Sequence, residues 1–138
     1  MSQDIARIVM DLLAAWNEHD VERAAGFYAQ NYEGIDVGQA SKQYGPRERV
    51  RILESFVRAF PDLHFTGETV VEGNRAVLVW TMYGTHRGKI MNIPPSGREI
   101  SIRGVSVMTI QNGKITHGLN IWDTAGFLRA VKLLPDLA

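Results

Sequence analysis

Apolar residues in the first part of the chain recur at the three- and four-residue spacing of amphipathic helices. The first such run covers residues 5–16 and predicts a helix of about four turns. Asp20 then precedes a shorter run and can cap a second helix over Val21–Tyr28. A third helix is predicted over residues 45–60, because Pro46 suits its first turn and Pro61 follows its last residue.

From residue 63 onward the pattern changes to that of β-strands. Asn112-Gly113 separates the last two of four strand-like segments and is the strongest short-range signal for a hairpin. We therefore predict a curved antiparallel sheet after the three helices, a loop or short strand at residues 34–45, and a final helix over about residues 124–134. The four segments are rich in β-branched and aromatic residues, with short turns between them: residues 63–71, 75–88, 98–110 and 114–123.

The chain shows no linker, repeat or low-complexity tract, so a single α+β domain over residues 1–138 is predicted. Fifteen basic residues balance fifteen acidic ones, so the chain has no net positive charge that would attract nucleic acid or an anionic membrane. Asp4, Arg7 and Asp11 interrupt the first apolar run, which argues against a signal peptide or a membrane span there. We expect a cytoplasmic protein that binds a neutral small molecule or another protein.

Several kinds of chemistry lack the residues they need. The chain has no cysteine, which excludes disulfides, thiolate metal sites and thiol nucleophiles. Its four histidines form no His-x-x-x-His pair, and neither a phosphate-binding glycine loop nor a Gly-x-Ser-x-Gly nucleophile motif is present. We therefore expect no metal and no other cofactor.

Asp123 is the carboxylate with the strongest claim to a chemical role. It lies between Trp122 and the start of the last predicted helix, where desolvation would suit it to act as a general acid or base. Aspartate is also a preferred helix N-cap, a role that would favour its charged form. Both interpretations stay open, because Thr124 could cap the helix instead and leave Asp123 free to face a cavity.

The segment at residues 98–110 has one face that leaves room for a ligand: Ile102, Gly104, Ser106 and Met108. Glycine in a strand more often marks a bend or bulge. Aromatic residues at periodic positions could line such a cavity or simply fill the core. The opposite face carries Val105 and Val107, and two-fold pairing is the commonest way to cover an apolar sheet, so we expect a homodimer.

Histidine is the side chain that ordinarily titrates near neutral pH. His64 and His86 lie near strand ends, and His117 shares the nominal strand face of Asp123 under the period-two rule. A structural role is the commoner explanation for any one of them.

Four segments resemble the SnoaL-like polyketide cyclase family, which has the nuclear transport factor 2-like fold: residues 59–65, 83–104, 113–117 and 122–131. The resemblance implies a cone-shaped α+β fold whose curved sheet and helices enclose an apolar pocket. It further implies aldol-type ring closure or isomerisation of a hydrophobic carbonyl compound without a metal or cofactor. The family's acid/base aspartate falls on Asp123.

The chain departs from the family pattern around that aspartate. Gly104 and Ser106 stand where the cyclases have a glutamine and a histidine, and His117 is one place from the family histidine. An early tyrosine and histidine or asparagine of the family are replaced, which leaves Tyr32 and Asp36.

The leading hypothesis is a cofactor-independent enzyme in which Asp123 removes a proton α to a carbonyl. His117, with Ser106 or Tyr83 as alternatives, would donate a hydrogen bond to the enolate oxygen. The alternatives are a non-catalytic small-molecule-binding protein that uses the same pocket and, less favoured, an assembly protein without a pocket. Substrate contacts are expected from Trp16, Tyr32, His64, Tyr83, His86, Gly104, Ser106, Met108 and Trp122.

Overall fold

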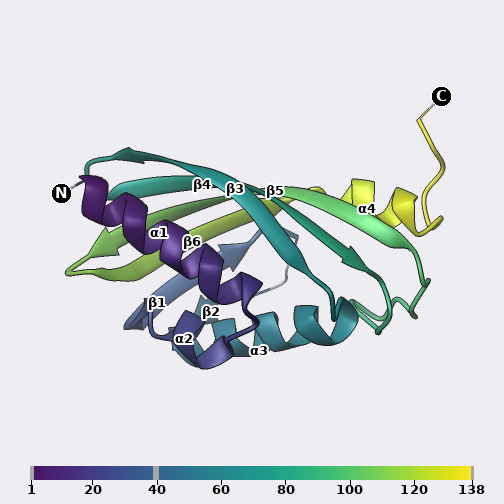
Figure 1. The fold of residues 1–138 in the computed structure, drawn as a ribbon, viewed down its shortest axis with the longest axis horizontal. Coiled ribbons are helices and arrows are strands. Elements are labelled where there is room, and N and C mark those ends of the chain that lie inside the picture. The colour runs from purple at the N-terminus through teal and green to yellow at the C-terminus, as the bar shows by residue number, and fades with distance from the viewer. Residues whose placement is uncertain (1, 39–40, 138) are drawn as a thin grey trace.

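The described chain forms one six-stranded curved sheet with helices packed against it (Figure 1). The computed structural model describes residues 2–38 and 41–137. Its helices are α1 (Ser2–Asn17), α2 (Val21–Ala25), α3 (Gly45–Ala59) and α4 (Thr124–Ala130). Its strands are β1 (Tyr28–Asp36), β2 (Gln43–Tyr44), β3 (His64–Glu72), β4 (Arg75–Thr85), β5 (Glu99–Gln111) and β6 (Lys114–Trp122), in the spatial order β2-β1-β6-β5-β4-β3. The predicted α+β class is confirmed.

Strands β3 to β6 form an antiparallel meander, as predicted. The turn between β5 and β6 contains Asn112 at φ 52° and Gly113 at φ 78°. Positive φ at both central residues is the requirement of a type I′ hairpin turn, and asparagine followed by glycine meets it at little steric cost. The predicted hairpin is therefore confirmed.

Strand β1 begins earlier than the sequence pattern predicted, because the pattern placed a helix up to Tyr28 and a loop or short strand only over residues 34–45, where β2 is found. Helix α2 ends at Ala25 instead of Tyr28, and β1 begins at Tyr28. It pairs in parallel with β6, where Ile35 lies opposite Leu119, so the sheet is mixed and not wholly antiparallel. The strand alternation is hard to read because the register shifts between Tyr28 and Glu33.

Helix α4 is also shorter than predicted, because it ends at Ala130 and not near residue 134. Lys132 has a φ of 67°, a left-handed conformation that a helix cannot continue through. The helix lies at one end of the molecule, next to the C-terminal segment (Figure 1).

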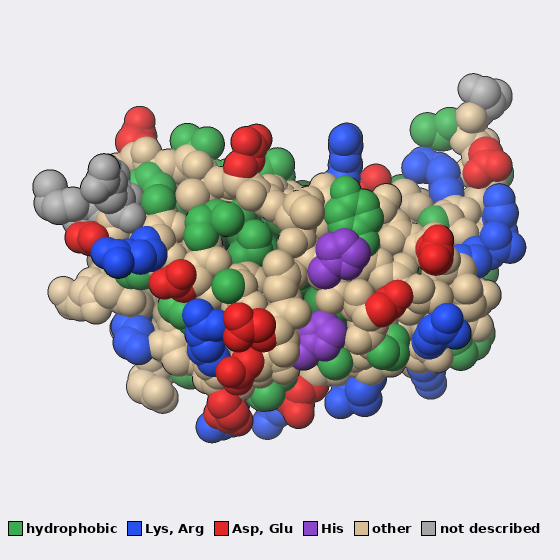
Figure 2. Space-filling model, in the orientation of Figure 1, with side chains coloured by type: hydrophobic (Ala, Val, Ile, Leu, Met, Phe, Trp, Pro, Cys, Tyr) green, Lys and Arg blue, Asp and Glu red, His purple; other side chains and the backbone are tan. Residues whose placement is uncertain are grey.

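Alternation along the strands gives the sheet two different faces. The inner face points toward α1 and α3, and β4 contributes Ala76, Leu78, Trp80 and Met82 to it. Apolar residues of α1 pack on this face; Trp16, for example, meets Phe65 edge to face with ring centroids 5.5 Å apart. The outer face carries the alternate residues of each strand, such as Val77, Val79 and Thr81 of β4. On the view in Figure 2, acidic and basic side chains are interspersed over the surface.

His86 is completely buried in a second core cluster, between the rings of Phe60 and Phe127, each 5.5 Å away. Its Nδ1 accepts a hydrogen bond from the backbone N–H of Ser96 at 3.2 Å, which assigns the ring proton to Nε2. Among residues 2–38 and 41–137, no group makes a well-aligned hydrogen bond with Nε2. Burial lowers the pKa of His86, and the imidazole is therefore neutral at pH 7.

This histidine is expected to make the protein sensitive to mild acid. Because its pKa is lower in the folded protein than in the unfolded chain, its contribution to stability is complete above the unfolded pKa of about 6.5 and is lost as the pH falls toward the folded pKa. His86→Gln should therefore lose less unfolding free energy than the wild type between about pH 8 and about pH 5 in urea titrations. His64→Gln, at an exposed histidine, is the control and should behave as the wild type. Equal losses in the wild type and His86→Gln would refute this account.

Candidate functional site

A cavity of about 90 Å³ lies between the inner face of the sheet and helices α1 and α3. Its walls are mainly apolar and aromatic, because the inward positions of the strands and the facing stripes of both helices meet there. The aromatic lining consists of Trp16, Tyr28, Tyr32, Phe56, Phe65, Trp80 and Trp122.

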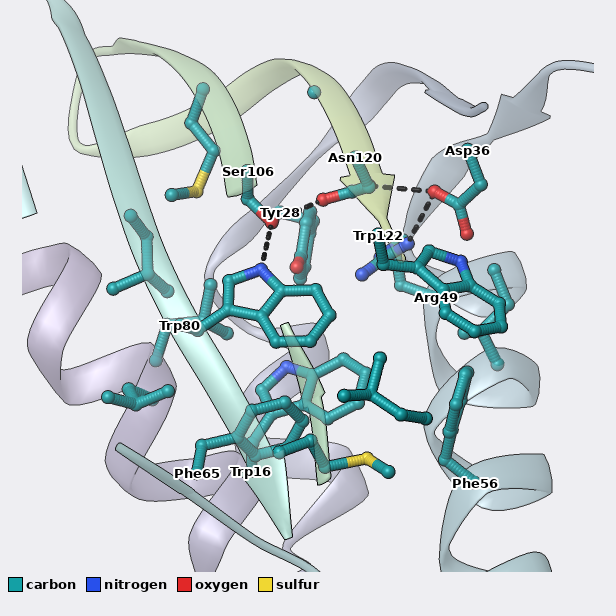
Figure 3. Close-up of a pocket in the computed structure, with 18 of the residues that line it drawn as sticks. Trp16, Tyr28, Asp36, Arg49, Phe56, Phe65, Trp80, Ser106, Asn120 and Trp122 are labelled. Carbon is teal, nitrogen blue, oxygen red and sulfur yellow. Dashed lines mark hydrogen bonds and ion pairs between the residues drawn. The ribbon is translucent and has the colours of Figure 1, made fainter. Parts of the chain in front are cut away.

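A chain of hydrogen bonds crosses one side of this cavity (Figure 3). The indole N–H of Trp80 donates to Ser106 Oγ at 3.1 Å, and the Ser106 hydroxyl donates to Asn120 Oδ1 at 2.6 Å. Asn120 Nδ2 then donates to Asp36 Oδ1 at 2.8 Å. These three hydrogen bonds link the side chains of Trp80, Ser106 and Asn120 to Asp36, and they fix the position of the Asp36 carboxylate.

Asp36 also forms a buried ion pair with Arg49 of α3. Arg49 Nη1 lies 3.5 Å from Asp36 Oδ1 and donates to Gln43 Oε1 at 3.0 Å. The guanidinium lies over the rings of Trp16 and Tyr28, 5.8 and 5.5 Å from their centroids. Burial lowers the pKa of Arg49, but nearby Tyr28 and other groups raise it by more, so the pKa is above its ordinary value and the side chain is a cation.

The two oxygens of Asp36 have different surroundings. Oδ1 receives both the Asn120 hydrogen bond and the Arg49 ion pair, whereas the other oxygen takes neither of these drawn interactions (Figure 3). The carboxylate is therefore held in place through one oxygen while the other can accept a proton from a bound molecule.

Tyr32 contributes a second polar group to the same region. Burial raises the pKa of its phenol above the ordinary value, so it keeps its proton and can donate a hydrogen bond. Its hydroxyl lies over Gly118 of β6, where any side chain would collide with the ring. The glycine thus allows the phenol to approach the sheet.

Gly104 plays the corresponding part for Trp80. A side chain at this position would overlap the indole of Trp80, which lies directly opposite on β4. The space predicted at Gly104 is therefore filled by the Trp80 ring, and Gly104 does not line the cavity, which corrects its expected role as a substrate contact. Ser106, Met108 and Ile102 line the cavity as expected.

Of the other predicted contact residues, Trp16, Tyr32 and Trp122 line the cavity. Three expectations need correction. His64 and Tyr83 stack on each other with centroids 5.1 Å apart at outward positions of β3 and β4, away from the cavity. His86 is buried in the second core cluster instead of the cavity wall.

His117 also lies away from the cavity. Its side chain is 61% exposed, and its Nε2 is 3.9 Å from Glu33 on the neighbouring strand β1. The inward positions of β6 are Gly118, Asn120 and Trp122. His117 therefore has the opposite parity and faces outward, which does not fit the role of a hydrogen-bond donor to a substrate in this cavity.

Asp123 serves as the N-cap of α4. Its Oδ1 accepts a hydrogen bond from the backbone N–H of Gly126 at 2.8 Å, and the residue is exposed and absent from the cavity lining. Strand β6 ends at Trp122, so the strand parity no longer determines where Asp123 points. The geometry supports the capping interpretation and gives no support to a base at this position.

The capping role predicts a specific pattern of stability changes. Asp123→Ala should lower the free energy of unfolding by about 1 kcal/mol, whereas Asp123→Asn should be nearly neutral because asparagine is an equally good N-cap. Urea denaturation measures both, and Thr124→Ala is the control because Thr124 is not the cap. A loss for Thr124→Ala as large as that for Asp123→Ala would contradict the assignment.

Three residues of the polar site were not among the predicted site residues: Asp36, Arg49 and Asn120. Arg49 stands on the helical stripe that includes Leu53, Phe56 and Phe60, and a charged residue on an apolar stripe is a recognisable signal. Asn120 gives the same kind of signal, because it is a polar residue at an inward position of β6, between Leu119 and Ile121. For Asp36 the pattern predicts only a loop or short strand over residues 34–45, so no face could be assigned.

Comparison with protein families gives one match: the SnoaL-like polyketide cyclase family model matches residues 6–131. No curated protein sequence matches the chain.

Known structures share the cone-shaped α+β fold. AclR from Streptomyces galilaeus, a proposed hydroxylase, has a TM-score of 0.89 at 22% identity, with 100% of this chain and 87% of that chain covered. TsrD from Streptomyces laurentii has a TM-score of 0.86 at 25% identity, with coverages of 97% and 98%. IdmH from Streptomyces antibioticus, a proposed polyketide cyclase, has a TM-score of 0.80 at 20% identity, with coverages of 92% and 97%.

Two searches of the described residues were negative. No helix there is long and apolar enough to cross a membrane. No group of three or more histidine, aspartate or glutamate side chains in residues 2–38 and 41–137 is arranged to hold a metal ion.

Proposed function

We propose that this chain, which belongs to the SnoaL-like polyketide cyclase family, is a cofactor-independent enzyme that transfers a proton within a hydrophobic carbonyl compound. The observation that carries the proposal is the Asp36 carboxylate at the polar end of an aromatic cavity. Its Oδ1 takes the Asn120 hydrogen bond and the Arg49 ion pair, and its other oxygen takes part in neither (Figure 3).

In the proposed reaction Asp36 removes a proton from the carbon α to a carbonyl. The C–H electron pair moves into the enolate, and the positive charge of Arg49 stabilises the enolate oxygen. In a cyclisation the enolate carbon attacks a second carbonyl of the same molecule, a C–C bond forms, and the resulting alkoxide takes the proton back from Asp36. In an isomerisation Asp36 returns the proton to another carbon.

A carboxylate is a weak base compared with an ordinary ketone enolate, which restricts the substrate. Compounds whose α-proton is made acidic by two carbonyl groups need only a weak base, provided that it is well placed. Asp36 is well placed because Asn120 and Arg49 hold it. Asp123 as the base stays a prediction from the family pattern, and its exposed capping position favours Asp36 for this role.

Proton exchange tests the proposal without knowledge of the natural substrate. A phenyl-substituted 1,3-diketone is dissolved in D₂O with the wild-type protein, and NMR follows the loss of its α-proton signal. Exchange faster than in buffer alone supports an enzyme. Binding of the diketone without faster exchange would instead favour the alternative, a non-catalytic small-molecule-binding protein, because the same cavity would then only hold the ligand.

We further propose a homodimer formed through the outer face of the sheet. Apolar outward residues lie side by side across three strands, since Val79 pairs with Val105 and Val105 with Ile121. Val79 and Ile121 are each 44% exposed in the single chain. Burial of such a row against a second copy would remove apolar surface from water.

The dimer proposal predicts a mass of twice 15.4 kDa by light scattering at micromolar concentration. Ile121→Lys should give a monomer, because it would place two buried charges in the interface. Met10→Lys on α1 is the control, since Met10 is also exposed but lies away from the outer sheet face, and it should remain dimeric. A monomeric wild type would refute the proposal.

A further inference from the structure

A second and larger space adjoins the cavity. This outer cleft has a volume of about 520 Å³ and lies between α3 and the loop after β4. It shares four lining residues with the inner cavity: Asp36, Ile52, Phe56 and Trp122. Phe56 and Trp122 meet edge to face with centroids 6.3 Å apart, so an aromatic pair stands at the boundary between the two spaces.

The two volumes set a limit on what each space can hold. A cavity on the order of 150 Å³ is enough for one benzene ring. The inner cavity, at about 90 Å³, is smaller, so a short branched chain fits it as it stands and a single ring is the upper limit that it reaches when its side chains shift. Ligand pockets typically measure about 300–1,000 Å³, a range that includes the outer cleft. A molecule that reaches both spaces crosses the boundary formed by these four residues, and Asp36 is the charged one among them.

The charges of the outer cleft favour an anion. Lys42 and Lys89 line it, and neither forms an ion pair with a described residue. The acidic side chains facing the same space are Glu48 and Asp36. Since Asp36 is offset by Arg49, the two lysines outweigh the one remaining carboxylate, and the cleft has an excess of one positive charge.

The inner cavity has a different character. Its walls are aromatic and aliphatic apart from the polar chain that ends at Asp36, so the end of the ligand that enters it must be apolar.

We propose that the substrate is an amphipathic anion that lies across both spaces. A single ring or branched apolar end occupies the inner cavity, the reacting carbon lies at Asp36, and a chain ending in an anionic group extends into the outer cleft beside Lys42 and Lys89. This assignment rests on the proposed function for the position of the reacting carbon, but its binding geometry can be tested separately.

Calorimetry with two series of probes tests the geometry: ω-phenylalkanoates of increasing chain length, and the ω-phenylalkanols of the same lengths. Short acids and alcohols should bind alike. Once the chain is long enough to leave the inner cavity, the acid should bind about three- to fivefold more tightly than the matching alcohol, an advantage that high salt reduces. Lys42→Met and Lys89→Met should each diminish this preference while leaving the affinity of the alcohol unchanged.

Arg51→Met is the matched control, because it removes an exposed cation of α3 that does not line the cleft. This variant should keep the full preference for the acid. Equal affinities of acid and alcohol at every chain length would overturn the proposal, and so would a preference that survives in both lysine variants. These measurements involve no turnover. The binding proposal can therefore be refuted while proton exchange by Asp36 is observed, and the proposed function can be refuted while the acid preference is observed.

Discussion

Turnover is expected to fall by roughly two to four orders of magnitude when Asp36 is replaced by asparagine, as is typical for loss of a general base. Asparagine has nearly the same shape and keeps an oxygen for the Asn120 hydrogen bond, but it cannot take up the α-proton. The rate of α-proton exchange of the phenyl-substituted 1,3-diketone in D₂O measures the effect.

Two control variants separate chemistry from folding. Asp36→Asn leaves the Arg49 charge without its partner, so the Asp36→Asn/Arg49→Met double variant shows whether a lost ion pair alone accounts for lost stability. Asp123→Asn should exchange the proton at the wild-type rate, since Asp123 lies outside the cavity. An active Asp36→Asn protein together with an inactive Asp123→Asn protein would return the base to Asp123.

Arg49→Met is expected to lower the free energy of unfolding by about 3–5 kcal/mol, the usual cost of breaking a buried ion pair from one side. The substitution leaves the Asp36 carboxylate buried without a countercharge, and it removes the donor to Gln43. It also removes the cation from the rings of Trp16 and Tyr28. Urea denaturation at neutral pH gives the value.

The double variant Asp36→Asn/Arg49→Met should recover much of this loss, because neither charge then remains buried. Its proton exchange should stay as low as that of Asp36→Asn. Arg51→Met, at an exposed position of the same helix, is the control and should change stability by less than about 0.5 kcal/mol. A double variant as unstable as Arg49→Met would show that the charge pair is not the cause.

Much of the fold could be predicted because it depends on local patterns. The type I′ turn at Asn112-Gly113 needs only two residues, and Pro46 marks the first turn of α3. The inward face of β5 also follows from simple alternation, and Ser106 and Met108 lie where the pattern places them.

The site was harder to predict because it depends on contacts between distant segments. Strand parity puts His117 with Leu119 on one face of β6, but only the packing of α1 and α3 decides which face is inside. Asp36 belongs to a strand whose irregular register hides its alternation. The family pattern directs attention to Asp123, and the hydrogen bond to Gly126 accounts for that carboxylate as a cap.

The parallel pairing of β1 with β6 determines when the site can exist during folding. Asp36 and Asn120 are separated by 84 positions along the chain, yet a single hydrogen bond joins them. Contacts of such high sequence separation require closure of a long loop, which is entropically costly and slows folding. On the ribosome the antiparallel hairpins can begin to form while the chain is still being made, but the cavity acquires its polar end only after Asn120 has emerged to pair with Asp36. The proposed acid/base group is therefore fixed in place only when β6 pairs with β1, a strand that is synthesised much earlier.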